Sequence, residues 1–384
     1  MAQIQGSPER ADINRRKEKI LVAMSGGVDS AMAAYLLLKQ GYEVIGVTMR
    51  LYDERSTFTP SQCRGATCSP SDQNDAHEVA RALGIRHYMV NYSEEFRHRV
   101  VEPFVLNYIN GLTPSPCILC NSLLKFSKLR HFAQCLGVDK VATGHYAMVQ
   151  YDEITQRYVL YKGRDAAKDQ SYFLFQLKQD QLRDTVFPVG ELSKSEIREL
   201  ARAINLPVAE KEESQEVCFI PDNDYVGFIE RYIEKYPSFA QPQTGEIVRT
   251  DGTLVGMHDG IHRFTIGQRR GLGVAVGEPL YVVAIDAYRH RVIVGTKDEV
   301  FSRRFYITCS NWIATPSLDE EIDVEVKIRS RFNPARAKIS PWSQNGAMVT
   351  FAEPQPAVTP GQAAVFYWDE VVVGGGWIYK SERD

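Results

Sequence analysis

The chain has 384 residues, more than one hydrophobic core usually organises, so two or three domains are expected. Its composition, 44% hydrophobic and 24% charged, is that of a globular protein, and its net charge of -3 excludes a protein that is basic overall. Any nucleic acid must therefore be bound by a local patch. No apolar stretch is long enough to span a bilayer, and the first twenty residues have neither the apolar core of a signal peptide nor the acid-poor composition of a transit peptide. The sequence thus predicts a cytosolic protein.

The N-terminal half predicts strands that alternate with helices. Strands are expected at residues 20–24, 43–49, 87–90 and 138–143. Helices are expected at residues 29–40 and 71–83, each followed by a glycine that ends it, and from a capping box at Ser193 and Glu196 to a point before Pro207. Such alternation is typical of a parallel, doubly wound α/β sheet.

The pattern changes after residue 221. Residues 240–300 are rich in glycine and in short strand-like runs. From about residue 302 apolar and polar residues alternate, so that Val324, Val326 and Ile328 share one face of a strand. This part therefore predicts an antiparallel β module, most simply a small barrel.

The loop after the first strand has a composition suited to phosphate binding. It reads Ser25-Gly26-Gly27-Val28-Asp29-Ser30, and it leads into a helix whose first N–H groups are free to bind anionic oxygens. Ser25 and Ser30 can add hydroxyl donors, and Asp29 can hold Mg²⁺. The loop lacks the lysine of a Walker A motif and resembles instead the SGGxDS loop of the ATP pyrophosphatases, or PP-loop enzymes. That resemblance implies transfer of AMP to an acceptor oxygen, which turns the oxygen into a leaving group.

In a reducing compartment, the seven cysteines are expected to stay reduced unless they take part in chemistry or bind metal. Cys117 and Cys120 lie in PCILCN, ahead of an amphipathic run, and Cys218 lies in SQEVCFIP much later in the chain. Thiolates of low pKa serve as nucleophiles, persulfide carriers or metal ligands. The remaining cysteines are interpreted as small or surface residues without a role, namely Cys63, Cys68, Cys135 and Cys309. The closeness of Cys63 to Cys68 leaves a second metal or disulfide role open.

Taken together, the motifs resemble those of the tRNA-specific 2-thiouridylases of bacteria and organelles over nearly the whole chain. The matching segments are MSGGVDS, TPSPCILCN with Lys125-Phe126, ATGHYA, GRDAAKDQSYFL, ESQEVCFIPD, DGIHRFTIGQRRGLG and TPGQAAVFY. The resemblance implies ATP-dependent 2-thiolation of the wobble uridine in tRNAs of the lysine, glutamate and glutamine type. It also implies a flexible tail (1–18), a PP-loop catalytic domain (19–221), a central domain (222–300) and a tRNA-contacting β-barrel (301–384).

The resemblance assigns expected roles to single residues. The ATP site is expected at Ala23, Met24, Ser25, Gly26, Gly27, Val28, Asp29, Ser30, Met49 and Gly144. Cys120 would be the catalytic nucleophile and Cys218 the persulfide carrier, and the two would form a transient disulfide as sulfur is released. Contacts with tRNA are expected at Ser115, Pro116, Cys117, His145, Lys168, Asp169, Gln170, Arg329, Ser330 and Gln362, the first three against the target base. His145 could instead be a core histidine and Lys168 a solvated charge, and the surroundings of Arg329 and Ser330 match less well.

One position departs from the family pattern. Many members carry aspartate where this chain has Cys117, and a carboxylate there could assist proton transfer. Cys117, Cys120 and Cys218 could instead be three ligands of a [4Fe–4S] cluster with one iron open to bind sulfide. The spacing alone does not decide between a cluster and a persulfide, although three cysteines converging in a reducing compartment slightly favour the cluster.

The RNA would have to be held by local features. Arg263, Arg269 and Arg270 lie among glycines, which suits a loop that grips phosphates, a solvated turn being the alternative. The wobble base must leave its stack to reach the site, and a single-stranded anticodon loop makes that easy. The sulfur donor would be a cysteine desulfurase or a sulfur-relay protein.

Two other functions compete with thiolation. Other PP-loop enzymes, such as lysidine, GMP or argininosuccinate synthetases, use nitrogen nucleophiles and need no widely separated cysteine pair. A catalytically silent RNA-binding or iron–sulfur scaffold protein would not need the intact SGGVDS loop.

Overall fold

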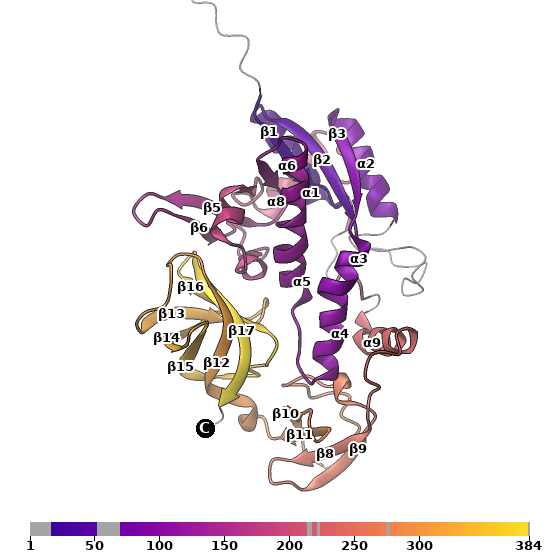
Figure 1. Cartoon of the computed structure of the whole chain (residues 1–384), viewed down its shortest axis with the longest axis vertical. Coiled ribbons are helices and arrows are strands. Elements are labelled where there is room, and N and C mark those ends of the chain that lie inside the picture. Colours follow the sequence, from indigo (N-terminus) through magenta and orange to yellow (C-terminus); the bar gives the residue numbers. More distant parts are fainter. Residues whose placement is uncertain (1–16, 52–69, 213–216, 221–222, 275–276, 383–384) are drawn as a thin grey trace, which may run out of the picture.

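The computed structural model describes residues 17–51, 70–212, 217–220, 223–274 and 277–382. Cys63, Cys68 and most of the predicted N-terminal tail lie outside these residues. An α/β body, a β-barrel and a small four-stranded sheet are arranged around one another, with the α/β body at the top of Figure 1. In the described part of the chain, no helix is long and apolar enough to cross a membrane.

A five-stranded parallel sheet forms the centre of the α/β body, in the order β3-β2-β1-β4-β7. Its strands are β1 (Lys19–Ala23), β2 (Glu43–Arg50), β3 (Arg86–Asn91), β4 (Lys140–Ala142) and β7 (Thr185–Val186). The helices that cover it are α1 (Val28–Lys39), α2 (Pro70–Leu83) and α8 (Lys194–Ala203) on one face and α6 (Lys128–Cys135) on the other. Ile20 and Val22 of β1 pack on the first face and Leu21 on the second, as expected for a strand that is buried on both sides. The predicted doubly wound α/β sheet is confirmed.

The predicted ends of these elements are close to the observed ones because their signals are local. The capping box opens α8, since Ser193 Oγ accepts a hydrogen bond from the Glu196 N–H (3.3 Å) and Glu196 Oε2 accepts one from the Ser193 N–H (2.7 Å). The fourth strand is shorter than predicted because the N–H of Val138 bonds to the carbonyl of Ala133 (3.0 Å) and closes α6. Periodicity does not reveal β7, which has only two residues.

The C-terminal part is a closed antiparallel barrel, as predicted. Its strands follow the order β12-β15-β14-β13-β16-β17, and β17 pairs back with β12. They are β12 (Phe301–Trp312), β13 (Ile322–Lys327), β14 (Ala335–Ser343), β15 (Gly346–Pro356), β16 (Ala363–Trp368) and β17 (Val371–Glu382). Val324, Val326 and Ile328 all lie in the barrel core. Closure leaves no unpaired edge, which is how such small barrels avoid aggregation.

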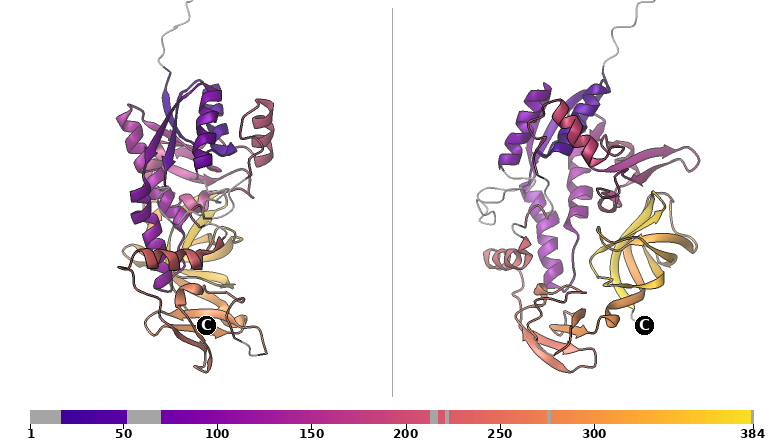
Figure 2. Two further views of the ribbon diagram at one scale, coloured as in Figure 1. Left: turned by 90° about the vertical axis from the view of Figure 1, so that its right-hand side faces the viewer. Right: turned by 180° about the vertical axis from the view of Figure 1, so that it is seen from behind.

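The remaining elements are a hairpin, the small sheet and further helices. The hairpin of β5 (Ala147–Asp152) and β6 (Arg157–Lys162) projects from the α/β body above the barrel and joins its sheet through the pair Tyr161–Val371 (Figure 2). The small sheet has the order β10-β11-β8-β9, with β8 (Gly245–Arg249), β9 (Leu254–His258), β10 (Tyr281–Asp286) and β11 (Arg291–Gly295). Further helices are α3 (Ser93–Phe96), α4 (Glu102–Ile109), α5 (Pro116–Leu119), α7 (Gln179–Arg183) and α9 (Tyr225–Lys235).

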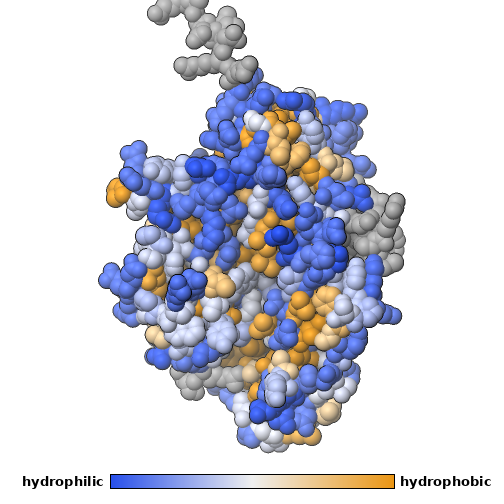
Figure 3. All heavy atoms as spheres, in the orientation of Figure 1, coloured by the Kyte–Doolittle hydropathy of each residue, from blue (hydrophilic) through white to orange (hydrophobic). Residues whose placement is uncertain are grey.

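The face shown in Figure 3 is mostly hydrophilic, with an apolar patch over α4. On that helix, the side chain of Leu106 is 45% exposed.

Candidate functional site

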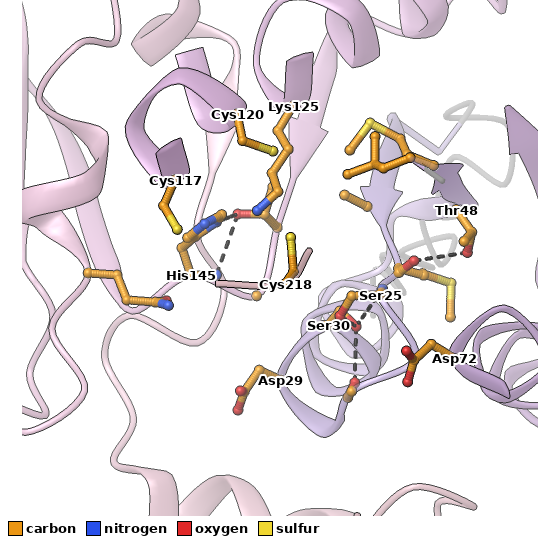
Figure 4. A pocket seen from close by; sticks show the side chains of 18 of the residues that line it. Ser25, Asp29, Ser30, Thr48, Asp72, Cys117, Cys120, Lys125, His145 and Cys218 are labelled. Atoms are coloured by element: carbon orange, nitrogen blue, oxygen red, sulfur yellow. Dashed lines mark hydrogen bonds between the residues drawn. The ribbon is translucent and has the colours of Figure 1, made fainter. Parts of the chain in front are cut away.

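A cavity of about 350 Å³ opens where β1, β2 and β4 end. In open α/β sheets, ligands bind outside the carboxyl ends of the strands. Its walls are the loop after β1, the turns after β2 and β4, and segments that carry three cysteines (Figure 4). Its volume lies in the range of small-molecule sites.

The loop after β1 is held in shape by its own hydroxyl groups. Ser30 Oγ accepts a hydrogen bond from the Ser25 N–H (3.1 Å) and donates one to the Gly27 carbonyl (3.0 Å). Thr48 of β2 donates to the carbonyl of Met24 (2.9 Å) and fixes the start of the loop. The loop is therefore preorganised, which reduces the entropy lost when a ligand binds.

Two glycines allow this loop to be packed from both sides. Gly26 has a φ of +75°, and a Cβ atom there would lie 2.2 Å from the carbonyl oxygen of Asp72 in α2. A Cβ atom on Gly144, in the turn after β4, would lie 2.6 Å from the backbone of Asp29 and Ser30. Larger residues would push the loop away from α2 or from β4.

Asp29 is held by a lysine and a tyrosine at this end of the cavity. Both of its carboxylate oxygens accept hydrogen bonds from Lys194 Nζ (2.7 and 2.8 Å), and Oδ1 also accepts one from the Tyr146 hydroxyl (2.7 Å). Lys194 is the first residue of α8, and its side chain is 10% exposed. A second lysine, Lys211, donates to the Gly26 carbonyl (3.1 Å) and to the carboxylates of α2.

Sequence reasoning missed both lysines. Lys194 lies within the capping-box motif that was used to place α8, but nothing local shows that its side chain reaches a loop 165 positions earlier. Lys211 is 185 positions away from its partner Gly26. The signal that could have indicated them is the absence of a lysine from the loop itself. The charge of bound phosphates then has to be neutralised by cations from other parts of the chain.

The three cysteines approach the cavity from two segments. Cys117 lies on α5, Cys120 begins a π-helical turn (Cys120–Lys125), and Cys218 lies in the turn formed by residues 217–220. In Figure 4 they lie around Lys125 and His145, to one side of the phosphate loop. π-Helical turns are rare and occur frequently at functional sites.

Burial disfavours the thiolate form of Cys117 and Cys120. It raises the pKa of Cys117 to about 11, where the neighbouring Cys218 adds to the effect, and it raises the pKa of Cys120 to about 12. The Lys125 ammonium lowers both pKa values, but by less than burial raises them. At neutral pH both thiols are therefore protonated in the free protein, and they need a reaction partner or a charge change to become nucleophiles.

His145 is a neutral side chain at neutral pH. Burial, followed by the charge of Lys125, lowers its pKa well below the ordinary value. Its Nδ1 atom forms a hydrogen bond with the Thr143 hydroxyl (2.6 Å), and its ring packs between Phe126 and Phe187. It lines the cavity as a hydrogen-bonding group and not as a cation for phosphate.

Mg²⁺ is expected at this site, and an iron–sulfur cluster is the alternative to a persulfide. In the described ranges, no three His, Cys, Asp or Glu side chains are grouped as a metal site. Cys117, Cys120 and Cys218 share the cavity but do not form the ligand set of a cluster in this arrangement. Mg²⁺ needs only one or two carboxylates besides phosphates and water, and Asp29 at the cavity wall fits that demand.

Most residues predicted from the sequence line this one cavity. They are Ala23, Met24, Ser25, Gly27, Val28, Asp29, Ser30, Met49, Pro116, Cys117, Cys120, Gly144, His145, Lys168, Gln170 and Cys218. Gly26, Ser115, Asp169, Arg329, Ser330 and Gln362 are not among the lining residues. Asp169 has a side chain that is only 4% exposed and accepts hydrogen bonds from Gly163 and Ser171. Arg329 stacks on Phe332 after β13.

Gln362 of the barrel holds the segment that leads to Cys117. Its Nε2 atom donates to the carbonyls of Thr113 and Pro114 (both 3.0 Å), and its Oε1 atom accepts from the Ser115 hydroxyl (3.2 Å). The neighbouring Gly361 has a φ of +90°, and a Cβ atom there would lie 3.0 Å from the Thr113 backbone. The barrel thus positions the cysteine segment, and Gln362 and Ser115 are engaged with each other.

The predicted arginine loop has all three of its arginines exposed, namely Arg263, Arg269 and Arg270. Arg263 also donates a hydrogen bond to Glu230 of α9 (2.6 Å). Gly267, Gly271 and Gly273 adopt positive φ values, so this segment is a loop that changes direction repeatedly. The exposed arginines remain candidates for phosphate contacts.

The comparisons with known proteins cover nearly the whole chain. Family models described as tRNA methyl transferase HUP domain, tRNA methyl transferase PRC-barrel domain and aminomethyltransferase beta-barrel domain match residues 18–222, 228–296 and 302–378. A protein named tRNA-specific 2-thiouridylase MnmA from Geotalea uraniireducens is 48% identical over 95% of this chain and 96% of its own. Proteins of the same name from Solibacter usitatus (45%) and Koribacter versatilis (46%) each match over 94% of this chain and 99% of theirs.

Proposed function

The chain belongs to the family of tRNA-specific 2-thiouridylases, and on that premise we propose that it replaces O2 of the wobble uridine of tRNA with sulfur in an ATP-dependent reaction. The observation that carries this proposal is that a PP-loop and three cysteines line the same cavity. An adenylating enzyme with a nitrogen nucleophile has no use for these thiols. Methyl transfer, which two model descriptions mention, needs neither an activated oxygen nor a sulfur carrier.

The first half-reaction activates the base. The uridine O2 attacks the α-phosphorus of ATP, the bond to the bridging oxygen breaks, and pyrophosphate leaves, so that C2 carries AMP through its oxygen. Loop N–H groups and the Ser25 hydroxyl line the cavity and can bind the phosphates, whereas the Ser30 hydroxyl donates to the Gly27 carbonyl within the loop. Met49 and Gly144 line the same site. Mg²⁺, which Asp29 would hold, would neutralise phosphate charge.

The second half-reaction delivers sulfur. In the persulfide route, the outer sulfur of a Cys218 persulfide attacks C2 and AMP leaves. The Cys120 thiolate then attacks the Cys218 sulfur, which releases 2-thiouridine and leaves a Cys120–Cys218 disulfide. A cellular thiol reduces that disulfide, and a cysteine desulfurase or sulfur-relay protein reloads Cys218. The thiols line the same cavity as the phosphate loop, which supports delivery of sulfur at the activated base.

The tRNA is bound jointly by the three proposed domains, residues 19–221, 222–300 and 301–384. Pro116, Lys168 and Gln170 line the cavity, so they can meet the extruded base and its phosphates. The exposed arginines of the central domain suit contacts with the RNA backbone. Because the barrel holds the segment before Cys117, tRNA bound on the barrel can influence the cysteine site. We place the reaction in the cytosol.

Deleting the gene tests the proposed function. Nucleosides from the tRNA of the deletion strain should lack 2-thiouridine derivatives at the wobble position, because no other site in this scheme makes the C2–sulfur bond. A plasmid copy of the wild-type gene should restore them. Unchanged 2-thiouridine in the deletion strain would refute the proposal.

Cys117→Asp separates the two sulfur routes. In the persulfide route, protein prepared without oxygen should contain negligible iron, and Cys117→Asp should keep thiolation activity, since the family pattern has aspartate at that position. Iron and acid-labile sulfide should be assayed in both proteins. Near-equal iron and sulfide, both lost in Cys117→Asp, would instead establish the cluster, because a carboxylate is a harder and weaker ligand for iron than a thiolate.

A further inference from the structure

The phosphate loop has no lysine of its own, yet the cavity beside it contains several. Among the described residues that line it, four are lysines: Lys125, Lys168, Lys194 and Lys211. Lys125 lies beside the cysteines and His145 (Figure 4). Lys211 is held by the Gly26 carbonyl and by Asp72 and Asp75, so it braces the loop against α2. Lys194 is the lysine bonded to Asp29, the loop's acidic side chain.

The Lys194–Asp29 pair is unequal in burial. The Lys194 side chain is 10% exposed, whereas that of Asp29 is 30% exposed. A carboxylate with that much exposure is solvated without a cation, while the ammonium has lost most of its water. The pair thus sets a nearly buried ammonium against a partly solvated carboxylate at the wall of the cavity, where a negatively charged ligand can reach both.

The position of Lys194 suits a phosphate ligand. It is the first residue of α8, where Ser193 and Glu196 fix the helix start and the Lys194 N–H donates to Asp165 (2.9 Å). The backbone that carries the ammonium is therefore rigid, while the side chain ends at the cavity next to the loop. A lysine is a compact cation that binds phosphate from a fixed anchor.

We propose that Lys194 binds the pyrophosphate part of ATP and stabilises the pyrophosphate as it leaves, taking the place of the lysine that the loop lacks. This inference rests on the proposed adenylation reaction. When ATP enters, the ammonium turns from Asp29 to the terminal phosphates, and Asp29 keeps its hydrogen bond from Tyr146. Negative charge builds on the β-phosphate as the bond to the α-phosphorus breaks, and the ammonium neutralises it.

Binding of three ligands to Lys194→Met tests this role. By calorimetry, the affinities for ATP and for pyrophosphate should each fall about 10-fold or more, as expected for loss of one charge-assisted contact. The affinity for AMP should stay within about twofold of wild type, because AMP lacks the terminal phosphates. Pyrophosphate release in the presence of tRNA should slow about 100-fold, and Lys194→Arg should recover part of that loss.

Lys128→Met is the matched control, because Lys128 also pairs with a carboxylate, Glu95 (3.5 Å), but does not line the cavity. Its nucleotide affinities should equal those of wild type. If Lys194→Met does not fold, Lys194→Gln keeps a donor for Asp29 without the charge and should show the same loss for ATP.

An equal loss of AMP and ATP affinity would overturn the inference, because it would mean that Lys194 only shapes the loop. Unchanged ATP affinity would overturn it as well. A different result would refute the proposed function, namely wild-type protein that binds ATP but releases no pyrophosphate in the presence of tRNA. The affinities of Lys194→Met for ATP and for AMP would then still decide where Lys194 acts.

Discussion

Asp29→Ala is expected to slow pyrophosphate release at least about 100-fold while tRNA binding stays largely intact. Asp29 lies in the phosphate loop, lines the nucleotide cavity and bonds to Lys194. Its loss removes the predicted Mg²⁺ ligand and leaves the buried Lys194 ammonium without this partner. Since 2-thiouridine forms only from the activated base, thiolation should be lost in parallel. Pyrophosphate should be measured by a coupled assay and tRNA affinity by filter binding.

A control variant and a stability measurement accompany this experiment. Asp139→Ala, which changes an exposed aspartate of the same body, should release pyrophosphate like wild type. Asp29→Ala should also unfold at a lower temperature, because its free energy of unfolding should fall by about 1–2 kcal/mol. This loss is smaller than for a fully buried ion pair, since the Asp29 side chain is 30% exposed. Pyrophosphate release at the wild-type rate would refute the role of Asp29.

Cys120→Ser and Cys218→Ser should each reduce formation of 2-thiouridine at least about 1,000-fold, yet both variants should still adenylate tRNA. The two half-reactions separate because activation depends on the phosphate loop, whereas sulfur delivery depends on thiols that lie to one side of it (Figure 4). A hydroxyl cannot carry persulfide sulfur or form the disulfide. Tritiated ATP should label the tRNA in both variants, while nucleoside analysis should find no 2-thiouridine.

Cys135→Ser and Cys309→Ser are suitable controls, because both cysteines are exposed and away from the cavity. Both should thiolate tRNA normally. Normal 2-thiouridine formation by Cys120→Ser or by Cys218→Ser would contradict the assignment of these two residues. Loss of adenylation in both would instead mean that the thiols also shape the nucleotide site.

Elements with local signals could be predicted closely. The predicted helix before Gly41 and the capping box at Ser193 depend on a few neighbouring residues, and both appear in the structure. Val324, Val326 and Ile328 alternate in the sequence and are buried together in the barrel. Strand β7, with two residues, has no such signal, and its position is decided by pairing with β4.

The residues of the candidate site also divide into those with a local signal in the sequence and those whose place only the fold shows. The loop and the cysteine motifs carry composition that points to chemistry wherever they lie. The different fates of Lys168 and Asp169 could not be read from the sequence, because adjacent residues in a turn can point in opposite directions. The structure sends Lys168 to the cavity and buries Asp169 against Gly163 and Ser171.

By itself, the sequence determined the α/β and barrel architecture, the phosphate loop and the cysteines that belong to its chemistry, because these follow from periodicity, turn residues and short motifs. Only the tertiary structure decided that Lys194 meets Asp29 and that Gln362 grips the segment before Cys117. These contacts join residues 165 and 249 positions apart. Their physical reason is the packing of α8 on the sheet and of the barrel on the segment around Ile118 and Phe126. Burial of apolar surface brings these distant side chains together, and it carries no mark in the local sequence.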